Sequence, residues 1–322
     1  MSTNLVGKII LGLVLSLCQL ADAMEWHQLD LMRKAIQETT YRGEYMHRRG
    51  DKTSVYSVVH RYLDGKSEEL LRQLDGDMVE VLRTGDRLIC YYPEGSEGAL
   101  SQAVPAAPYS QVDALDLSQI AKNYQAVSVG MARVAGLQTH IIELTGDDSR
   151  YSHRFWLEAE TNLLLQSEII DGLGNILEQF RYTRIELGIP ISDADVTPSL
   201  VGDSSARQQT MFRTESSKVD DQSFLSRLNW LPPGYELTNA NRREENEGWI
   251  EQRTYSDGLT SFSVFAESKL TGSSQPMAVA KMGATTALMM AINGLSVTVI
   301  GEVPTKTAKQ IGQMLSVEEV AL

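Results

Sequence analysis

The spacing of hydrophobic positions changes along the chain. Near the N-terminus, apolar residues recur every three or four positions, which predicts an amphipathic helix up to about Thr39. These residues are Trp26, Leu29, Met32 and Ile36. From residue 43 to residue 92, short runs rich in Val, Tyr and Ile alternate with turn sequences such as Asp64-Gly65. Such short runs predict an antiparallel meander of strands and not βαβ units.

The next stretch continues the predicted sheet. Residues 115–121 fit a short helix, and further strands are expected at 137–144, 151–158, 163–170 and 176–187. The last two flank a turn-rich sequence, Asp171 to Asn175, which predicts a hairpin. Residues 24–187 are therefore predicted to form one domain, a curved antiparallel sheet with helices against it.

A second domain is predicted after a change of composition. Residues 188–222 hold two prolines, many Asp and Ser and few large apolar residues, which is typical of a linker. In residues 223–322, Asn293-Gly294 and Ser256-Asp257-Gly258 are hairpin signals, and Pro304 can open a terminal helix. The predicted fold class is α+β, with two domains and a smaller antiparallel sheet packed on a helix.

Residues 1–23 have the pattern of a secretory signal peptide. Lys8 precedes an apolar run from Ile9 to Leu17, and Ala21-Asp22-Ala23 offers a cleavage site. The run is about half the length that spans a bilayer, which disfavours an uncleaved anchor. A lipoprotein signal at Cys18 is disfavoured by the bulky Leu17 before it. We expect an exported protein that does not span the membrane after cleavage.

Composition and motifs narrow the class of function. The 322 residues carry a formal net charge of −13, which argues against nucleic-acid binding. After cleavage Cys90 is the one cysteine left, so no internal disulfide can form. The sequence shows no nucleophile elbow, no zinc-binding histidine pair and no phosphate loop. We therefore expect a binding protein, not an enzyme, with no metal and no cofactor.

Two sets of residues are candidates for binding. Alternation along the strands groups apolar side chains that could line a cleft for acyl chains, or could be ordinary core. These candidates are Tyr56, Val58, Val79, Val81, Leu88 and Tyr92. A second set is basic and could bind an anionic head group or an acidic peptide, or could be solvated turn residues. It consists of His47, Arg48, Arg49, Lys52 and Arg242.

Many short sequence blocks, in order along both domains, carry a resemblance to a known family. In the first domain they include Val58-Val59-His60-Arg61, Leu74-Asp75-Gly76, Glu80-Val81-Leu82-Arg83 and Cys90-Tyr91-Tyr92-Pro93. In the second they include Trp230-Leu231-Pro232-Pro233-Gly234-Tyr235, Tyr255-Ser256-Asp257-Gly258-Leu259 and Val299-Ile300-Gly301-Glu302-Val303-Pro304.

Together these blocks resemble the RseB/MucB family. The resemblance implies a periplasmic negative regulator of sigma-E or AlgU-type envelope-stress signalling. Such a regulator binds the periplasmic part of a membrane anti-sigma factor and shields it from regulated proteolysis, until lipopolysaccharide or another acylated molecule releases it. The resemblance also implies a larger domain like LolA/LolB, a half-open barrel with helices over its mouth. It supplies no catalytic residues. A periplasmic lipid or lipoprotein carrier is the alternative, and a homo-oligomer stays open.

Overall fold

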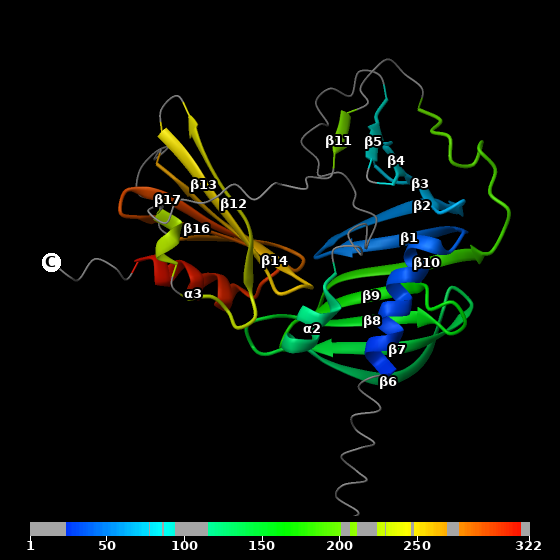
Figure 1. Ribbon diagram of the computed structural model, residues 1–322, viewed down its shortest axis with the longest axis horizontal. Coiled ribbons are helices and arrows are strands. Elements are labelled where there is room, and N and C mark those ends of the chain that lie inside the picture. Colours follow the sequence, from blue (N-terminus) through cyan, green and yellow to red (C-terminus); the bar gives the residue numbers. More distant parts are fainter. Residues whose placement is uncertain are drawn as a thin grey trace, which may run out of the picture.

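The computed structural model describes residues 24–76, 78–85, 87–93, 115–200, 207–210, 224–228, 230–245, 248–268 and 277–316. The predicted signal peptide, residues 1–23, lies outside them. Two sheets stand side by side, each with helical segments against it (Figure 1). No helix among the described residues is long and apolar enough to cross a membrane.

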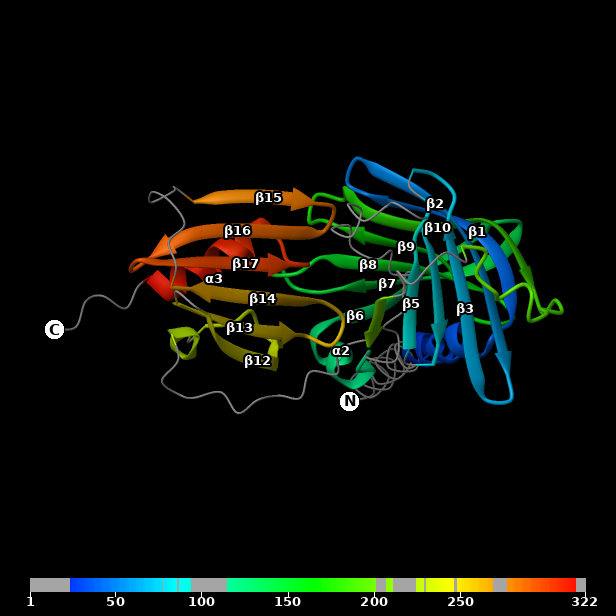
Figure 2. The same ribbon diagram turned by 90° about the horizontal axis from the view of Figure 1, so that it is seen from above.

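The larger sheet has eleven strands in the order β11-β5-β4-β3-β2-β1-β10-β9-β8-β7-β6. They are β1 (Tyr41–Arg49), β2 (Lys52–Leu63), β3 (Lys66–Gln73), β4 (Glu80–Thr84), β5 (Arg87–Tyr91), β6 (Gln125–Val134), β7 (Leu137–Thr145), β8 (Ser152–Glu158), β9 (Leu164–Ile170), β10 (Ile176–Leu187) and β11 (Arg207–Thr210). The sheet curls without closing, since β11 and β6 end it as separate edges (Figures 1 and 2). The predicted half-open antiparallel barrel is confirmed.

Local side chains fix the predicted hairpin between β9 and β10. The Asp171 carboxylate accepts hydrogen bonds from the backbone N–H of Leu173 at 2.9 Å and of Asn175 at 2.8 Å. Gly174 adopts the left-handed conformation that closes the turn, with φ of 85°. Because strand register depends on the turn, this loop aligns β10 with β9 and, through β10, with β1.

Two helices cover the sheet. The N-terminal helix, residues 24–38, buries Leu29 and Met32 against Ile120 of α2 (Leu117–Asn123) and against Leu157 of β8. Its apolar stripe is the one that the spacing predicts. Helix α2 begins at Asp116, whose carboxylate accepts hydrogen bonds from the N–H groups of Ser118 and Gln119.

The smaller sheet has six strands in the order β12-β13-β14-β17-β16-β15. They are β12 (Glu236–Glu245), β13 (Gly248–Ser256), β14 (Ser261–Glu267), β15 (Ala278–Met282), β16 (Thr285–Ile292) and β17 (Leu295–Gly301). Asn293 and Gly294 join β16 to β17 with φ of 50° and 77°, as the predicted two-residue turn requires. Helix α3 (Thr305–Ser316) follows Pro304 and packs on one face, beside the short helix η3 (Phe224–Arg227).

The first part of the predicted linker is bound to the larger sheet. Its residues 192–200 cross the face opposite the apolar cluster, where Arg42 pairs with Asp195 and Arg61 pairs with Asp193 at 2.7 Å. The buried Glu80 carboxylate accepts hydrogen bonds from the N–H of Ser199 at 2.6 Å and of Leu200 at 2.8 Å. We call residues 192–200 the strap. The outer limits of the linker stay a prediction.

Candidate functional site at the domain interface

The apolar candidates from the sequence lie together on the inner face of the larger sheet. Tyr56, Val58, Val79, Val81 and Leu88 belong to one buried cluster, and Tyr92 packs against it. The strand register aligns Val58, Leu71, Val81 and Cys90 across β2 to β5. Alternation along the strands thus groups these residues on one face, as predicted.

Tyr45 of β1 lies among the aromatic rings of this cluster. Its ring stacks on Tyr56 at 5.2 Å and meets Phe180 and Tyr182 edge-on at 4.9 Å and 5.7 Å. Burial, followed by the charge of Glu69, raises the pKa of the Tyr45 hydroxyl well above its ordinary value. The five buried candidates are 2% to 8% exposed. In this arrangement they form packed core, and contact with a ligand stays a prediction that requires the cluster to open.

The basic candidates separate into two groups. His47 and Arg49 both lie against Glu178 of β10, with ring Nε2 3.7 Å and guanidinium Nε 3.2 Å from its carboxylate. The other three lie apart: Arg48 donates to the carbonyl of Ile176, Lys52 is exposed, and Arg242 lies over the ring of Trp249. The structure therefore does not gather all five into one basic patch, and a role for any of them in binding anions stays a prediction.

Glu178 links the two domains. Its Oε1 accepts a hydrogen bond from the N–H of Ala284, in the second domain, at 3.0 Å. Burial alone would raise the pKa of this carboxyl, but the nearby His47 ring, the charge of Arg49 and the Ala284 N–H hold it below its ordinary value. Sequence reasoning placed His47 and Arg49 on a turn; the structure shows that this turn is a domain contact.

Gly283 allows the close approach at that contact. It has φ of +60°, and a Cβ there would lie 2.5 Å from Glu178 Oε1 and 2.8 Å from Arg49 Cγ. On the other side, a Cβ on Gly50 would lie 3.3 Å from the Gly283 nitrogen. The β1–β2 hairpin and the β15–β16 turn therefore touch through two glycines.

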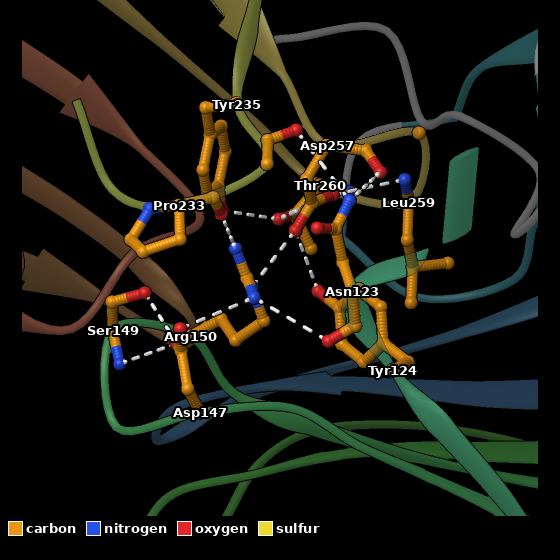
Figure 3. Close-up of polar contacts among 12 residues, drawn as sticks. Asn123, Tyr124, Asp147, Ser149, Arg150, Pro233, Tyr235, Asp257, Leu259 and Thr260 are labelled. Carbon is orange, nitrogen blue, oxygen red and sulfur yellow. Dashed lines mark hydrogen bonds and ion pairs between the residues drawn. The ribbon is translucent and has the colours of Figure 1, made fainter. Parts of the chain in front are cut away.

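A second contact between the domains is built around Asp257 (Figure 3). Asp257 follows β13, and its side chain is 0% exposed. Its Oδ2 accepts a hydrogen bond from the hydroxyl of Tyr124 at 2.8 Å and lies 3.2 Å from Arg150 Nε. Its Oδ1 accepts from the backbone N–H of Leu259 at 3.0 Å and of Thr260 at 2.8 Å. One carboxylate thus holds its own hairpin and binds the first domain.

Arg150, the partner of Asp257, lies before β8 and is also buried. Its guanidinium lies over the rings of Tyr124 and Tyr235, at 5.4 Å and 5.5 Å from their centroids. It also donates to the carbonyl oxygens of Asn123 and Pro233. A buried guanidinium needs such a set of partners, because unpaired charge is costly away from water.

Further hydrogen bonds extend this interface. The Tyr151 hydroxyl donates to the Val303 carbonyl at 3.2 Å, and Thr307 Oγ1 donates to the Ser149 carbonyl at 2.9 Å. Burial, followed by the charge of Glu178, raises the pKa of Glu302 to about 7. Residues 149–151 of the first domain therefore contact the second domain through several polar groups. No spacing in the sequence pairs Arg150 with Asp257, so sequence reasoning missed both.

The chain matches two family models in the order of its two domains. Residues 23–200 match the MucB/RseB N-terminal domain, and residues 220–316 match the MucB/RseB C-terminal domain. This chain belongs to the MucB/RseB family. The resemblance read from the sequence blocks is therefore confirmed, and the family match of the first domain ends where the strap ends.

Individual members of the MucB/RseB family match over almost the whole chain. The sigma factor AlgU regulatory protein MucB of Pseudomonas aeruginosa is 31% identical over 94% of this chain and 93% of its own. The sigma-E factor regulatory protein RseB of Haemophilus influenzae is 28% identical over 94% and 95%.

Solved structures of MucB share the fold of both domains together. The complex of Pseudomonas aeruginosa MucA/MucB matches with a TM-score of 0.71 and 27% identity, over 89% of this chain and 96% of that one. MucB in complex with MucA(peri) matches with a TM-score of 0.70 and 29% identity, over 92% and 98%.

Proposed function

We propose that this protein is a periplasmic negative regulator of an extracytoplasmic sigma factor. It binds the periplasmic part of a membrane anti-sigma factor and shields that part from regulated proteolysis. The carrying observation is that both domains match MucB in complex with MucA(peri), as one unit and over nearly the whole chain. Residues 1–23 serve in this proposal as the signal that exports the chain.

The proposed regulator acts by binding and not by catalysis. Family members are named as regulatory proteins. The buried ionisable groups Asp257, Glu80 and Glu178 hold hydrogen bonds within and between domains. Carboxylates that are held in such hydrogen bonds stabilise the fold and the contact between the domains. A protein that shields a partner by binding needs this stability.

The proposed release signal is lipopolysaccharide or another acylated molecule. The apolar cluster around Tyr56, Val58 and Val81 offers the apolar surface that an acyl chain would occupy. Burial of an acyl chain yields about 0.8 kcal/mol per CH₂ group. Because these side chains are buried, the N-terminal helix, whose Ala35 belongs to the cluster, has to move for a lipid to enter. Arg48 and Lys52 would then be available to a lipid phosphate.

The test is binding of the mature protein to the purified periplasmic part of the cognate anti-sigma factor, with and without lipopolysaccharide. We expect a complex that protects the anti-sigma segment from regulated proteolysis, and loss of that complex when lipopolysaccharide is added. Absence of a complex would overturn the regulator. A complex indifferent to lipid would overturn the release signal alone.

A lipid or lipoprotein carrier is the competing function, since a half-open barrel with an apolar interior suffices for it. A transfer assay distinguishes the two functions. A carrier moves a labelled lipid or lipoprotein between membranes, and the anti-sigma segment does not change the rate of that transfer. The hydrogen-bonded contact of the first domain with the second favours the regulator, because transport of a lipid does not call for it.

A further inference from the structure

The two edge strands of the smaller sheet differ in their protection. Strand β12 ends in the charged sequence Arg242 to Glu245, and its pairing with β13 shifts between Leu237 and Asn239. Charges and bulges of this kind block the addition of a further strand. Strand β15 pairs regularly with β16 and contains no proline. All five residues of β15 are exposed, and Lys281 is its one charge. Among the residues that the structure describes, no strand pairs with the outer edge of β15.

The sheet face beside this edge is apolar and exposed. The register aligns Ala278 with Met289 and Thr298, and the next row aligns Ala280 with Ala287 and Ile300. These rows point away from helix α3, because the alternate residues Leu288, Val297 and Val299 form the core under that helix. Met282, Met289 and Ile300 are 49%, 53% and 38% exposed. We call these three residues, with the free edge of β15, the β15 surface.

The β15 surface continues into the domain interface. Strand β15 ends at Met282, and the next residue is Gly283, which meets Gly50 and Glu178 of the first domain. In Figure 2, β15 is the outermost strand of its sheet and runs towards the β1–β2 hairpin. A strand added along β15 in either direction would therefore have one end at the junction of the domains.

We propose that the β15 surface docks an extended, largely apolar segment of the protein partner, which adds to the smaller sheet as a seventh strand. Main-chain hydrogen bonds to β15 would supply affinity, and alternate apolar side chains would lie beside Ala278, Ala280 and Met282 on the exposed face. This inference rests on the proposed function, since the partner it names is the periplasmic part of the anti-sigma factor.

Charge argues for this occupant over two others. Each copy of the chain carries a formal net charge of −13, so two copies repel one another at low ionic strength. The same charge disfavours approach to an anionic lipid surface. An extended, uncharged segment of a different protein avoids both obstacles, and it can satisfy the unpaired backbone groups of an edge strand, which lipid cannot.

The test places charges on the β15 surface of the full mature chain. We would compare Ala278→Asp/Ala280→Asp with Ala278→Lys/Ala280→Lys, so that an effect of charge sign on a charged partner can be recognised. The matched control is Asn241→Asp and Asn241→Lys, since Asn241 is exposed on the opposite edge strand of the same sheet. The probe is the purified periplasmic part of the cognate anti-sigma factor, titrated calorimetrically.

We expect both double variants to raise the dissociation constant at least about tenfold, and both controls to stay within about twofold of the parent. Unchanged melting temperatures establish that the variants are folded, and hydrogen exchange on the parent should show β15 amides protected by the partner. Equal affinity of parent and double variants overturns the β15 surface while leaving the regulator intact. Failure of the parent itself to bind overturns the proposed function instead.

Two further results would also overturn the inference. If sedimentation shows that the parent dimerises and the double variants do not, the occupant is a second copy. If the parent binds vesicles of phosphatidylethanolamine and phosphatidylglycerol and the double variants do not, the occupant is a lipid surface.

Discussion

Arg150 and Asp257 form an ion pair across the two domains, with Arg150 Nε 3.2 Å from Asp257 Oδ2. Their side chains are 2% and 0% exposed, so the pair is shielded from solvent. Removal of one member of such a pair leaves a buried charge without its counterpart, which costs more than the pair itself contributes.

Replacement of Asp257 by Ala should therefore lower the free energy of unfolding by about 3–5 kcal/mol, measured by urea denaturation. The matched control is Asp147→Ala, because Asp147 also pairs with Arg150, at 3.5 Å, but is 45% exposed. The control should cost about 1 kcal/mol or less. Equal costs for the two variants would contradict the role of burial.

Replacement of Gly283 by Ala should disturb the contact between the β15–β16 turn and Glu178. The new methyl group would need the Glu178 carboxylate to move, and the positive φ adds strain. We expect a loss of about 2 kcal/mol or more in unfolding free energy. Gly294→Ala is the control, because its φ is +77° but nothing lies within 4 Å. It should cost only about 1–2 kcal/mol.

Glu302 should make stability depend on pH. Its pKa is raised to about 7 in the folded protein by burial and by Glu178, against an ordinary value of 4.5. Between these values the folded state binds more protons than the unfolded state, so stability falls as pH rises from about 4.5 to 7. In the Glu302→Gln variant, we expect the decrease in unfolding free energy over this pH range to be smaller by about 1–3 kcal/mol. Denaturation at pH 5 and pH 8 measures it, and identical slopes for parent and variant would contradict it.

Glu80 should hold the strap on the larger sheet. Glu80→Ala removes the acceptor of the Ser199 and Leu200 N–H groups and should raise hydrogen exchange in residues 192–200 at least about tenfold. Glu186→Ala serves as the control, since Glu186 pairs with the largely exposed Arg184. A strap that stays equally protected in both variants would show that Arg42 and Arg61 suffice to hold it.

The features predicted from the sequence are those with a local cause. Asn293-Gly294, the Asp171 turn and the stripe containing Leu29 and Met32 each act within a few residues, and each formed as predicted. Strand β6 was not predicted, because Val127, Val129 and Met131 are exposed and its pattern is not that of a half-buried strand. Strand β15 was missed for the same reason.

The domain interface could not be predicted, because its partners lie far apart in the sequence and carry no shared motif. Asp257 reads as an ordinary turn residue, and Arg150 as one of many scattered charges. Likewise, the basic residues around Gly50 gave no indication that Glu178 would pair with two of them. Arg49 and Glu178 lie opposite one another because β1 pairs with β10, a long-range pairing that no local pattern in the sequence indicates.

The contact between the domains consists largely of hydrogen bonds and ion pairs, with Leu259 as one apolar member. A mutation deprives one of these groups of its partner, whereas separation of the whole domains would let water hydrate both. Separation of the domains would therefore expose mainly polar groups at these contacts. In the proposed regulator, a polar joint of this kind would let the domains change their relative position during release of the partner without exposing a new apolar surface.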